Sequence, residues 1–314
     1  MKNGDNTVFM QWAGGKSRLA PQLRDALDVI HKVMVEPFVG SGGLLLNRKT
    51  WDAKQVINDL DVGIYSLWKI VGSSEYGRFA EIFSKFPISP EGFDRCRDIK
   101  KKGFMGCNLM KKALITYYLV VYSFNGEMTS MVYRNRPEKW LGLKEKQIRR
   151  LFDSIELAHY QAAQCEILNT DARIVINSYK DNPDALIYID SPYVYELMGD
   201  RKDLYDIGFS CYDQIQMLEM IKKANAKICV SGYRGGSLLY DRYLNKDSGW
   251  HTYMIGEVTR SAGMCKAKKG SSHNKAKEFI WTNYVIPEST VYPNPLDLAL
   301  DMDQIDGFLF GEYI

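Results

Sequence analysis

The stretch VMVEPFVGSGG, residues 33–43, joins a short apolar run to a glycine-rich turn. Residues 33–39 predict a buried strand, and the segment that follows, LLLNRKTW (44–51), resembles a helix. Glycines at such a junction let the backbone turn tightly and approach a ligand closely. The stretch therefore predicts either a ligand-binding turn between strand and helix or a turn that serves the fold alone.

Further apolar runs repeat this pattern. They are QVINDL (55–60), ALIYID (185–190) and KICVSGY (227–233). Each leads into a turn or a helix-like stretch, so the chain predicts an α/β fold with a largely parallel sheet. Between about residues 69 and 160, helical patterns such as 111–122 and 143–163 replace the strands. This region predicts an inserted, mainly helical subdomain.

Two polar regions are candidates for contact with nucleic acid. In residues 122–140, Asn125-Gly126 is a two-residue turn signal, which predicts a short hairpin. Residues 259–277 predict an irregular basic loop. If a nucleic acid such as DNA is the partner, the candidate binding residues are Asn125, Arg134, Arg136, Lys266, Lys268 and Lys269. Arginine suits bidentate contact with guanine and lysine suits phosphate, but both segments can equally be solvated surface.

Composition narrows the functional classes. The net charge of the chain is only +3. If a nucleic acid is the partner, the positive charge that binds it must therefore be concentrated in part of the surface. Six cysteines and four histidines are scattered without a CxxC pair, which argues against zinc and against a secreted disulfide framework. No signal-peptide core or membrane-length apolar run is present. These features predict a soluble cytoplasmic protein.

An acidic residue near the end of the second strand suggests a nucleoside-type cofactor. The Asp59 carboxylate can accept hydrogen bonds from ribose hydroxyls. The spacing is not the dinucleotide fingerprint GxGxxG, because Leu45 occupies the third glycine position. The GKS at residues 15–17 is not a Walker loop either, since Met10 stands where that motif needs glycine.

A short polar motif follows the strand candidate 185–190. Asp190, Ser191, Pro192 and Tyr193 come at the carboxyl end of that strand, where α/β enzymes commonly collect their catalytic groups. The alternative interpretation is a plain turn, in which Pro192 blocks a helix and Tyr193 packs.

Taken in order, these segments resemble the Dam-like, D12-class adenine-N6 DNA methyltransferases. WAGGKSRL (12–19) is similar to the family's WxGGK motif, and EPFVGSGG (36–43) to its EPFxGxG cofactor loop. INDLD (57–61) resembles the acidic second-strand motif, and DSPY (190–193) the catalytic DPPY. IWTNY (280–284) resembles the carboxyl-terminal strand motif. The matches cover most of the chain, although residues 69–160 are recognisable mainly by position.

The resemblance implies a class I S-adenosylmethionine-dependent methyltransferase, with a Rossmann-like seven-stranded sheet flanked by helices. Residues 1–68 and 161–314 would form the catalytic and cofactor-binding domain, and 69–160 the target-recognition domain. The residues that would bind S-adenosyl-L-methionine are Trp12, Lys16, Glu36, Phe38, Gly40, Gly42, Asp59 and Asp171. Among them, Lys16 would help enclose the methionine part, and Asp171 would lie beside the adenine.

The implied reaction is site-specific methylation of the N6 amine of a flipped-out adenine in double-stranded DNA, without a metal. The Asp190 carboxylate and the main-chain carbonyl of Ser191 would each accept one N6 hydrogen, and Tyr193 would stack on the base. Pro192 completes the catalytic motif. The implied partners are DNA and, as a candidate, a cognate restriction endonuclease, with the chain acting as a monomer.

Ser191 departs from the proline usual in DPPY. The loss frees one φ angle, at a cost of about 0.4–1 kcal/mol, yet any residue there still offers a carbonyl. We therefore expect an active enzyme. Two alternatives stay open: a DNA-binding protein of this fold without turnover, and an amine methyltransferase that acts on RNA.

Overall fold

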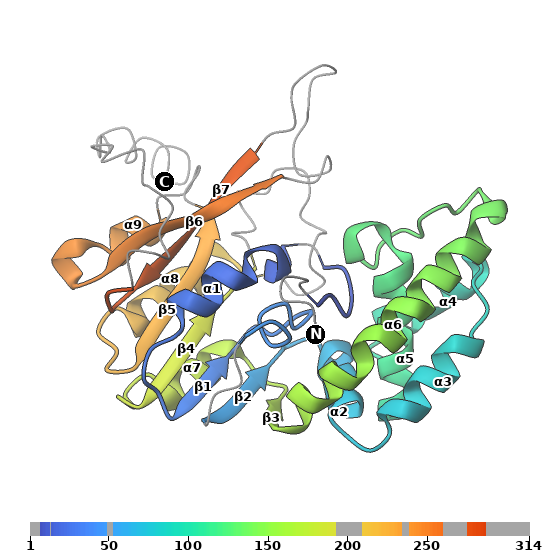
Figure 1. Cartoon of the computed structure of the whole chain (residues 1–314), viewed down its shortest axis with the longest axis horizontal. Helices are drawn as coiled ribbons and strands as arrows, with labels where there is room; N and C mark the ends of the chain where they lie inside the picture. Colours follow the sequence, from blue (N-terminus) through green and yellow to red (C-terminus); the bar gives the residue numbers. More distant parts are fainter. Residues whose placement is uncertain are drawn as a thin grey trace.

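The computed structural model describes residues 7–12, 14–48, 53–192, 209–233, 239–259 and 275–286. These residues form a seven-stranded sheet in the order β3-β2-β1-β4-β5-β7-β6 (Figure 1). Its strands are β1 (Val33–Glu36), β2 (Lys54–Asn58), β3 (Cys165–Leu168), β4 (Ala185–Ile189), β5 (Lys227–Tyr233), β6 (His251–Thr259) and β7 (Lys275–Thr282). β1 to β5 pair in parallel, and β7 is antiparallel to both β5 and β6. The expected α/β class and the seven-stranded sheet are confirmed.

Successive residues of the central strands enter two different apolar cores. Val35 and Ile187 pack with side chains of the helices on one face, whereas Met34 and Leu186 pack with α1 on the other. This alternation follows from the two-residue period of a strand, and burial on both faces explains why consecutive residues of β1 and β4 are mostly apolar. The covering helices are α1 (Ala20–Ala26), α7 (Ala172–Tyr179), α8 (Cys211–Ile221) and α9 (Leu239–Tyr243).

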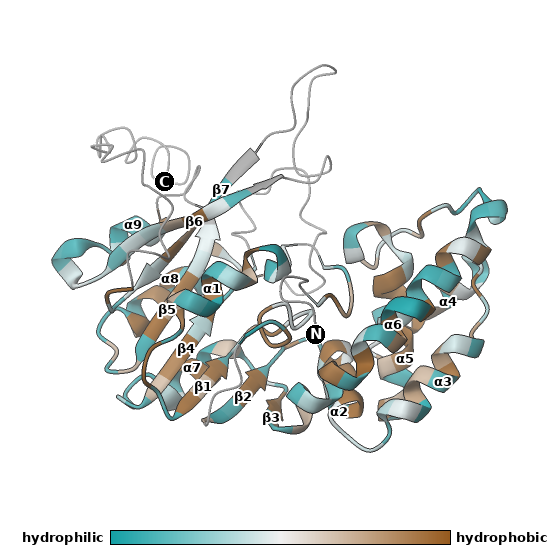
Figure 2. Cartoon of the chain, viewed as in Figure 1, coloured by the Kyte–Doolittle hydropathy of each residue, from teal (hydrophilic) through white to brown (hydrophobic). Residues whose placement is uncertain are grey.

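A set of helices, here called the helical body, lies beside the β3 edge of the sheet (Figure 1). It consists of α2 (Val62–Val71), α3 (Tyr76–Lys85), α4 (Pro90–Lys101), α5 (Leu109–Tyr122) and α6 (Trp140–Ala163). The apolar α5 is buried from Ala113 to Tyr122 and packs on α2 and α4 (Figure 2). The helices predicted at 111–122 and 143–163 are therefore present as α5 and α6. α2 already belongs to this packed set and begins at Val62.

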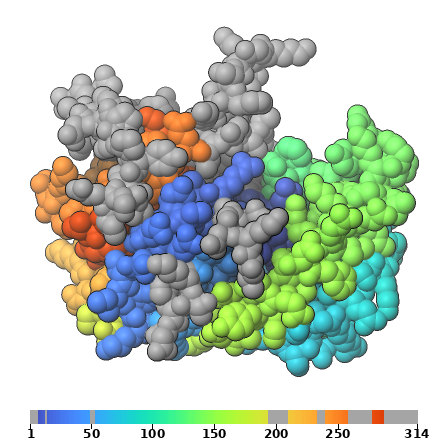
Figure 3. All heavy atoms as spheres, in the orientation of Figure 1, coloured from blue at the N-terminus to red at the C-terminus, as the bar shows by residue number. Residues whose placement is uncertain are grey.

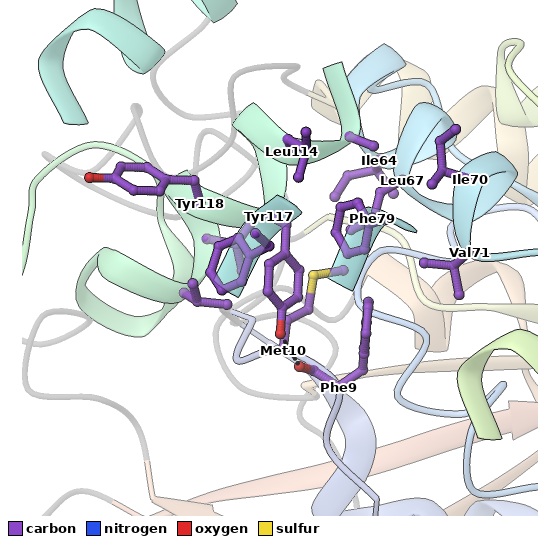
Figure 4. Close-up of a cluster of buried hydrophobic side chains, with 14 of the residues drawn as sticks. Phe9, Met10, Ile64, Leu67, Ile70, Val71, Phe79, Leu114, Tyr117 and Tyr118 are labelled. Atoms are coloured by element: carbon purple, nitrogen blue, oxygen red, sulfur yellow. Dashed lines mark hydrogen bonds between the residues drawn. The ribbon is translucent and has the colours of Figure 1, made fainter. Parts of the chain in front are cut away.

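The N-terminal segment contributes side chains to the core of the helical body. Phe9 and Met10 are buried there, with the Phe9 ring 5.1 Å from that of Tyr117 and 5.8 Å from that of Trp68 (Figure 4). Tyr117 also donates a hydrogen bond to the Phe9 carbonyl at 3.3 Å. In the space-filling view this segment, in dark blue, lies between α1 and the green helices (Figure 3).

Two local expectations were wrong. The described part of 44–51, residues 44–48, forms turns instead of a helix, because Leu44 enters the α1 core while Leu45 and Leu46 enter the core of the helical body. Residues 122–140 do not form a two-stranded hairpin. They contain one antiparallel bridge, between Ser123 and Met131, and short 3-10 turns.

Within the described residues, no helix has both the length and the apolar character needed to cross a bilayer.

Candidate active site

A pocket lies at the carboxyl ends of β1, β2 and β4, the edge at which α/β folds bind ligands. Its lining includes Trp12, Lys16, Glu36, Phe38, Gly40, Asp59, Asp171, Asp190, Ser191 and Pro192. Seven of the eight expected cofactor residues therefore line the same pocket as three of the four expected catalytic residues. Gly42 is the exception: it belongs to the glycine-rich turn but faces Trp68 and does not line the pocket.

The glycine-rich turn depends on two residues with positive φ. Gly40 has a φ of +48°, and a Cβ there would come within 3.3 Å of the Trp12 indole nitrogen. Gly42 has a φ of +69°, and its Cβ would lie 2.4 Å from the Trp68 ring. Trp68 also donates to the Gly40 carbonyl at 2.9 Å. One tryptophan thus lies over the turn and the other supports it from the helical body.

We expect Gly42→Ala to lower the free energy of unfolding by about 2–3 kcal/mol, because the new methyl group overlaps the Trp68 ring and the backbone stays left-handed. Urea denaturation measures the change. Gly77→Ala is the matched control, since Gly77 lies in α3 with no atom within 4 Å of the added Cβ. That control should be neutral or slightly stabilising. Equal stability of Gly42→Ala and the wild type would contradict the expectation.

Asp59 ties the end of β2 to the glycine-rich turn. Its two carboxylate oxygens accept hydrogen bonds from the backbone N–H groups of Gly40 and Asp61, each at 2.9 Å. Burial, and then the neighbouring Asp61 carboxylate, raise the pKa of Asp59 to about 7. Each oxygen keeps a second lone pair, so the carboxylate can also accept from a ligand.

The helical body supplies a cation to this corner of the pocket. Lys100 of α4 lies 2.6 Å from Asp61, and both side chains are largely buried. Asp61 also caps α2 by accepting from the backbone N–H groups of Gly63 and Ile64. The Asp61–Lys100 ion pair therefore connects the pocket edge of the sheet with two helices of the helical body, α2 and α4.

Asp171 both caps a helix and lines the pocket. Its carboxylate accepts from the backbone N–H of Arg173 at 2.8 Å and pairs with the Arg173 guanidinium, which lowers the pKa of Asp171. The preceding turn is fixed by Asn58, whose buried amide bonds to Pro37 and Thr170. Asn58 belongs to the INDLD segment, but the sequence argument did not assign it a role.

Glu36, the last residue of β1, and Phe38 both line the pocket. Glu36 is buried and forms an ion pair with the buried Arg48. Burial raises the pKa of Glu36, while the Arg48 charge opposes the rise. The Phe38 ring meets Phe209 edge to face, with centroids 5.4 Å apart. The sequence argument did not predict the contact between Arg48 and Glu36, because it interpreted residues 44–51 as a helix.

One oxygen of Asp190 is held by two donors. The Lys16 ammonium lies 2.6 Å from Oδ1, and the Ser231 hydroxyl donates to the same oxygen at 3.1 Å. Ser231 has a single hydroxyl hydrogen, so Tyr188 must be the donor in the 2.9 Å bond between those two residues. No described residue donates to Oδ2. That oxygen therefore remains as the acceptor for a ligand in the pocket.

Lys16 bridges carboxylates from two strands. Its ammonium lies 3.3 Å from the buried Glu278 of β7, in addition to Asp190. Burial alone would lower the pKa of Lys16, but Asp190 and Glu278 raise it well above its ordinary value. Lys16 is therefore a protonated donor. Sequence reasoning missed Glu278, although a charged residue at the start of the apolar run 278–286 was an available signal.

None of the candidate DNA-contacting residues that are described lines the pocket, although Asn125 directly precedes the lining residue Gly126. Arg134 is exposed and pairs with Asp94 of α4, and Arg136 is exposed. Asn125 is half-buried with a φ of +51°, and its amide nitrogen makes no hydrogen bond within the described residues. Lys266, Lys268, Lys269 and the catalytic candidate Tyr193 lie outside the described residues. In the described part of the chain, no cluster of three or more His, Cys, Asp or Glu forms a metal site.

The strand order, the parallel β1 to β5 and the pocket at their carboxyl ends define a class I methyltransferase fold. The model of the D12 class N6 adenine-specific DNA methyltransferases matches residues 12–253. The chain belongs to this family, as the resemblance predicted.

Named relatives agree with the family. The chain is 28% identical over 198 residues to the DNA adenine methylase of Salmonella typhimurium, covering 60% of this chain and 65% of that protein. It is 31% identical over 124 residues to the DNA adenine methylase of Escherichia coli (strain K12), covering 38% and 42%. It is 24% identical over 260 residues to the type II methyltransferase M.MjaIII of Methanocaldococcus jannaschii, covering 76% and 85%. The match thus spans just under two thirds of the length of the Salmonella relative.

Proposed function

We propose that this chain transfers the methyl group of S-adenosyl-L-methionine to the N6 amine of adenine in double-stranded DNA. The observation that carries the proposal is the Asp190 carboxylate at the pocket: Lys16 and Ser231 fix Oδ1, and none of the residues that the structure describes donates to Oδ2. Membership of the D12 class and the names of the relatives support the same reaction.

Methylation of N6 needs hydrogen-bond acceptors more than it needs a strong base. The lone pair of the amine is delocalised into the adenine ring, so the nitrogen attacks well only when both of its hydrogens are held. In this proposal Asp190 Oδ2 accepts one hydrogen, and the main-chain carbonyl of Ser191 accepts the other. Positioning and electrostatics then supply most of the rate enhancement.

The residues opposite Asp190 suit S-adenosyl-L-methionine. This group supplies an electrophilic methyl on a sulfonium. Asp59 can accept from ribose hydroxyls, and the space above Gly40 is one that a side chain would fill. In the proposed assignment Asp171 lies near the adenine, and Trp12 closes the turn. The roles of Glu36, Phe38 and Lys16 within the cofactor site stay predictions.

The Asp59 carboxylate should make cofactor binding depend on pH. Its pKa is about 7, so it is mostly protonated at pH 6 and ionised at pH 8. Only the ionised form offers acceptors to both ribose hydroxyls, and we expect binding to strengthen about tenfold from pH 6 to pH 8. Titration calorimetry with adenosine, which does not itself titrate in this range, measures the change.

Asp59→Asn is the control for this pH dependence. Its binding should be weaker and should vary little between pH 6 and pH 8, because the amide does not titrate. A wild-type protein whose adenosine affinity is the same at both pH values would refute the assignment of Asp59 to the ribose.

Duplex DNA requires base flipping, because N6 cannot reach a buried methyl donor from within the helix. We propose that Tyr193 stacks on the flipped adenine and that residues 69–160 recognise the flanking sequence. Asn125, Arg134, Arg136, Lys266, Lys268 and Lys269 are the proposed contacts. A cytoplasmic location, a monomeric state and a partner endonuclease likewise stay predictions.

The direct test is transfer of labelled methyl from S-adenosyl-L-methionine to unmethylated genomic DNA, with N6-methyladenine mapped by sequencing. We expect label on adenine within one short sequence. RNA and DNA already methylated at the mapped sites are the controls and should accept little label. Cofactor binding without transfer to DNA would overturn the proposal in favour of a DNA-binding role, and preferential labelling of RNA would reassign the substrate.

A further inference from the structure

Three side chains form a buried polar cluster behind the catalytic motif, here called the Ser191 cluster. Ser191 follows β4, Gln214 lies on α8 and Tyr240 lies on α9. Gln214 is fully buried, and the other two are nearly so. Buried polar groups are costly unless they are hydrogen-bonded, so their partners determine what this cluster does.

The hydrogen bonds of the Ser191 cluster close a ring. The Gln214 amide nitrogen donates to Ser191 Oγ at 3.1 Å, and Ser191 and Tyr240 share a bond of 3.1 Å. Tyr240 donates to the Gln214 amide oxygen at 3.0 Å. Ser191 Oγ also lies 3.3 Å from the same amide oxygen, so the single hydroxyl hydrogen of Ser191 can be donated either to Tyr240 or to Gln214. Each hydroxyl therefore has a partner for its hydrogen within the cluster.

The ring also holds the backbone that follows Ser191. The Gln214 amide nitrogen donates a second hydrogen bond, to the Pro192 carbonyl at 2.8 Å. The carbonyl of Ser191 thus lies between two anchored points, its own side chain and the Pro192 carbonyl. These bonds therefore restrain the backbone on both sides of the Ser191 carbonyl.

We propose that the Ser191 hydroxyl is a positioning group that aims the Ser191 carbonyl, and with it Asp190, at the target amine. This inference rests on the proposed methyl transfer. In the family motif a proline ring would restrain the backbone at this position; here α8 and α9 restrain it through hydrogen bonds. In this proposal Ser191, hydrogen-bonded to Gln214 and Tyr240, replaces the restraint of the proline, and the motif stays functional.

The test is a double-mutant cycle on the full chain, using Ser191→Ala, Tyr240→Phe and the double variant. Each single variant should slow single-turnover methyl transfer by on the order of tenfold, since each breaks the ring. The double variant should be little slower than either single one, because the ring is already open. The affinity for S-adenosyl-L-methionine should stay within about twofold, so kcat falls while the cofactor KM does not.

Tyr243→Phe is the matched control, because Tyr243 lies on the same helix outside the Ser191 cluster; it should transfer methyl at the wild-type rate. Wild-type rates in Ser191→Ala, or effects that multiply in the double variant, would overturn the inference. So would a loss of cofactor affinity parallel to the loss of rate, which indicates a merely structural role. An inactive wild-type protein would instead overturn the proposed function itself.

Discussion

Asp190→Asn is expected to slow methyl transfer by about 10²–10³-fold, the range seen when one preorganised electrostatic contact is removed from an active site. Asparagine keeps the shape of the side chain but has only one acceptor oxygen. The Lys16 ammonium and the Ser231 hydroxyl, which both meet Oδ1, will hold that oxygen. The amide NH₂ group then replaces Oδ2, and a donor faces the N6 donor of adenine.

The measurement is the single-turnover rate with a DNA substrate at saturating cofactor. Asp181→Asn is the matched control, because that carboxylate is 64% exposed and pairs only with the neighbouring Lys180 in the described structure. It should leave the rate unchanged. If Asp190→Asn were within a few-fold of the wild type, the carboxylate could not be the acceptor that the proposal requires.

Arg48→Met should produce the largest loss of stability, about 3–5 kcal/mol in the free energy of unfolding. The side chains of Arg48 and Glu36 are only 2% and 3% exposed, so water cannot replace the lost partner. Glu36 would be left as a buried carboxylate without its guanidinium. Urea denaturation measures the effect. The control is Arg78→Met, which removes an exposed ion pair with Glu75 and should lower the free energy of unfolding by less than about 1 kcal/mol.

The loss in Arg48→Met should depend on pH with a defined sign. Burial already raises the pKa of Glu36 above its ordinary value of 4.5, and removing the cation raises it further. The native variant therefore retains a proton that the unfolded chain releases, so its stability falls as the pH rises above 4.5. The deficit should be larger at pH 8 than at pH 5. A deficit independent of pH would show that packing, and not charge, accounts for the loss.

The fold was largely predictable because its strands are buried on both faces. The runs at 33–39, 55–60, 185–190 and 227–233 appear as β1, β2, β4 and β5. The leucines at 44–46 were misleading: leucine has a high helix propensity, yet the turn divides these three residues between two cores. Local pattern cannot reveal that a second core lies on the other side of the chain.

The position of the pocket was predictable where it follows from strand ends and motifs: Asp59 and Asp190, which both line it, come at the ends of predicted strands. The contacts between residues far apart in the sequence could not be predicted. Lys16 meets Asp190 across 174 positions of sequence, and the sequence argument had placed it beside the methionine part of the cofactor. Ser231 carries no motif signal, and Glu278 is marked only by its charge at the start of an apolar run. The pairing of β5 with β7 brings the two residues beside Asp190 and Lys16.

The buried position of Phe9 and Met10 limits how the protein can be divided. Their side chains complete the core of the helical body, while Lys16, a few residues further on, pairs with Asp190. The packing unit that contains the helices is therefore discontinuous in sequence. A chimaera that exchanges residues 62–163 between relatives must also carry matching residues at positions 9 and 10, or the transplanted helices will lack part of their interior.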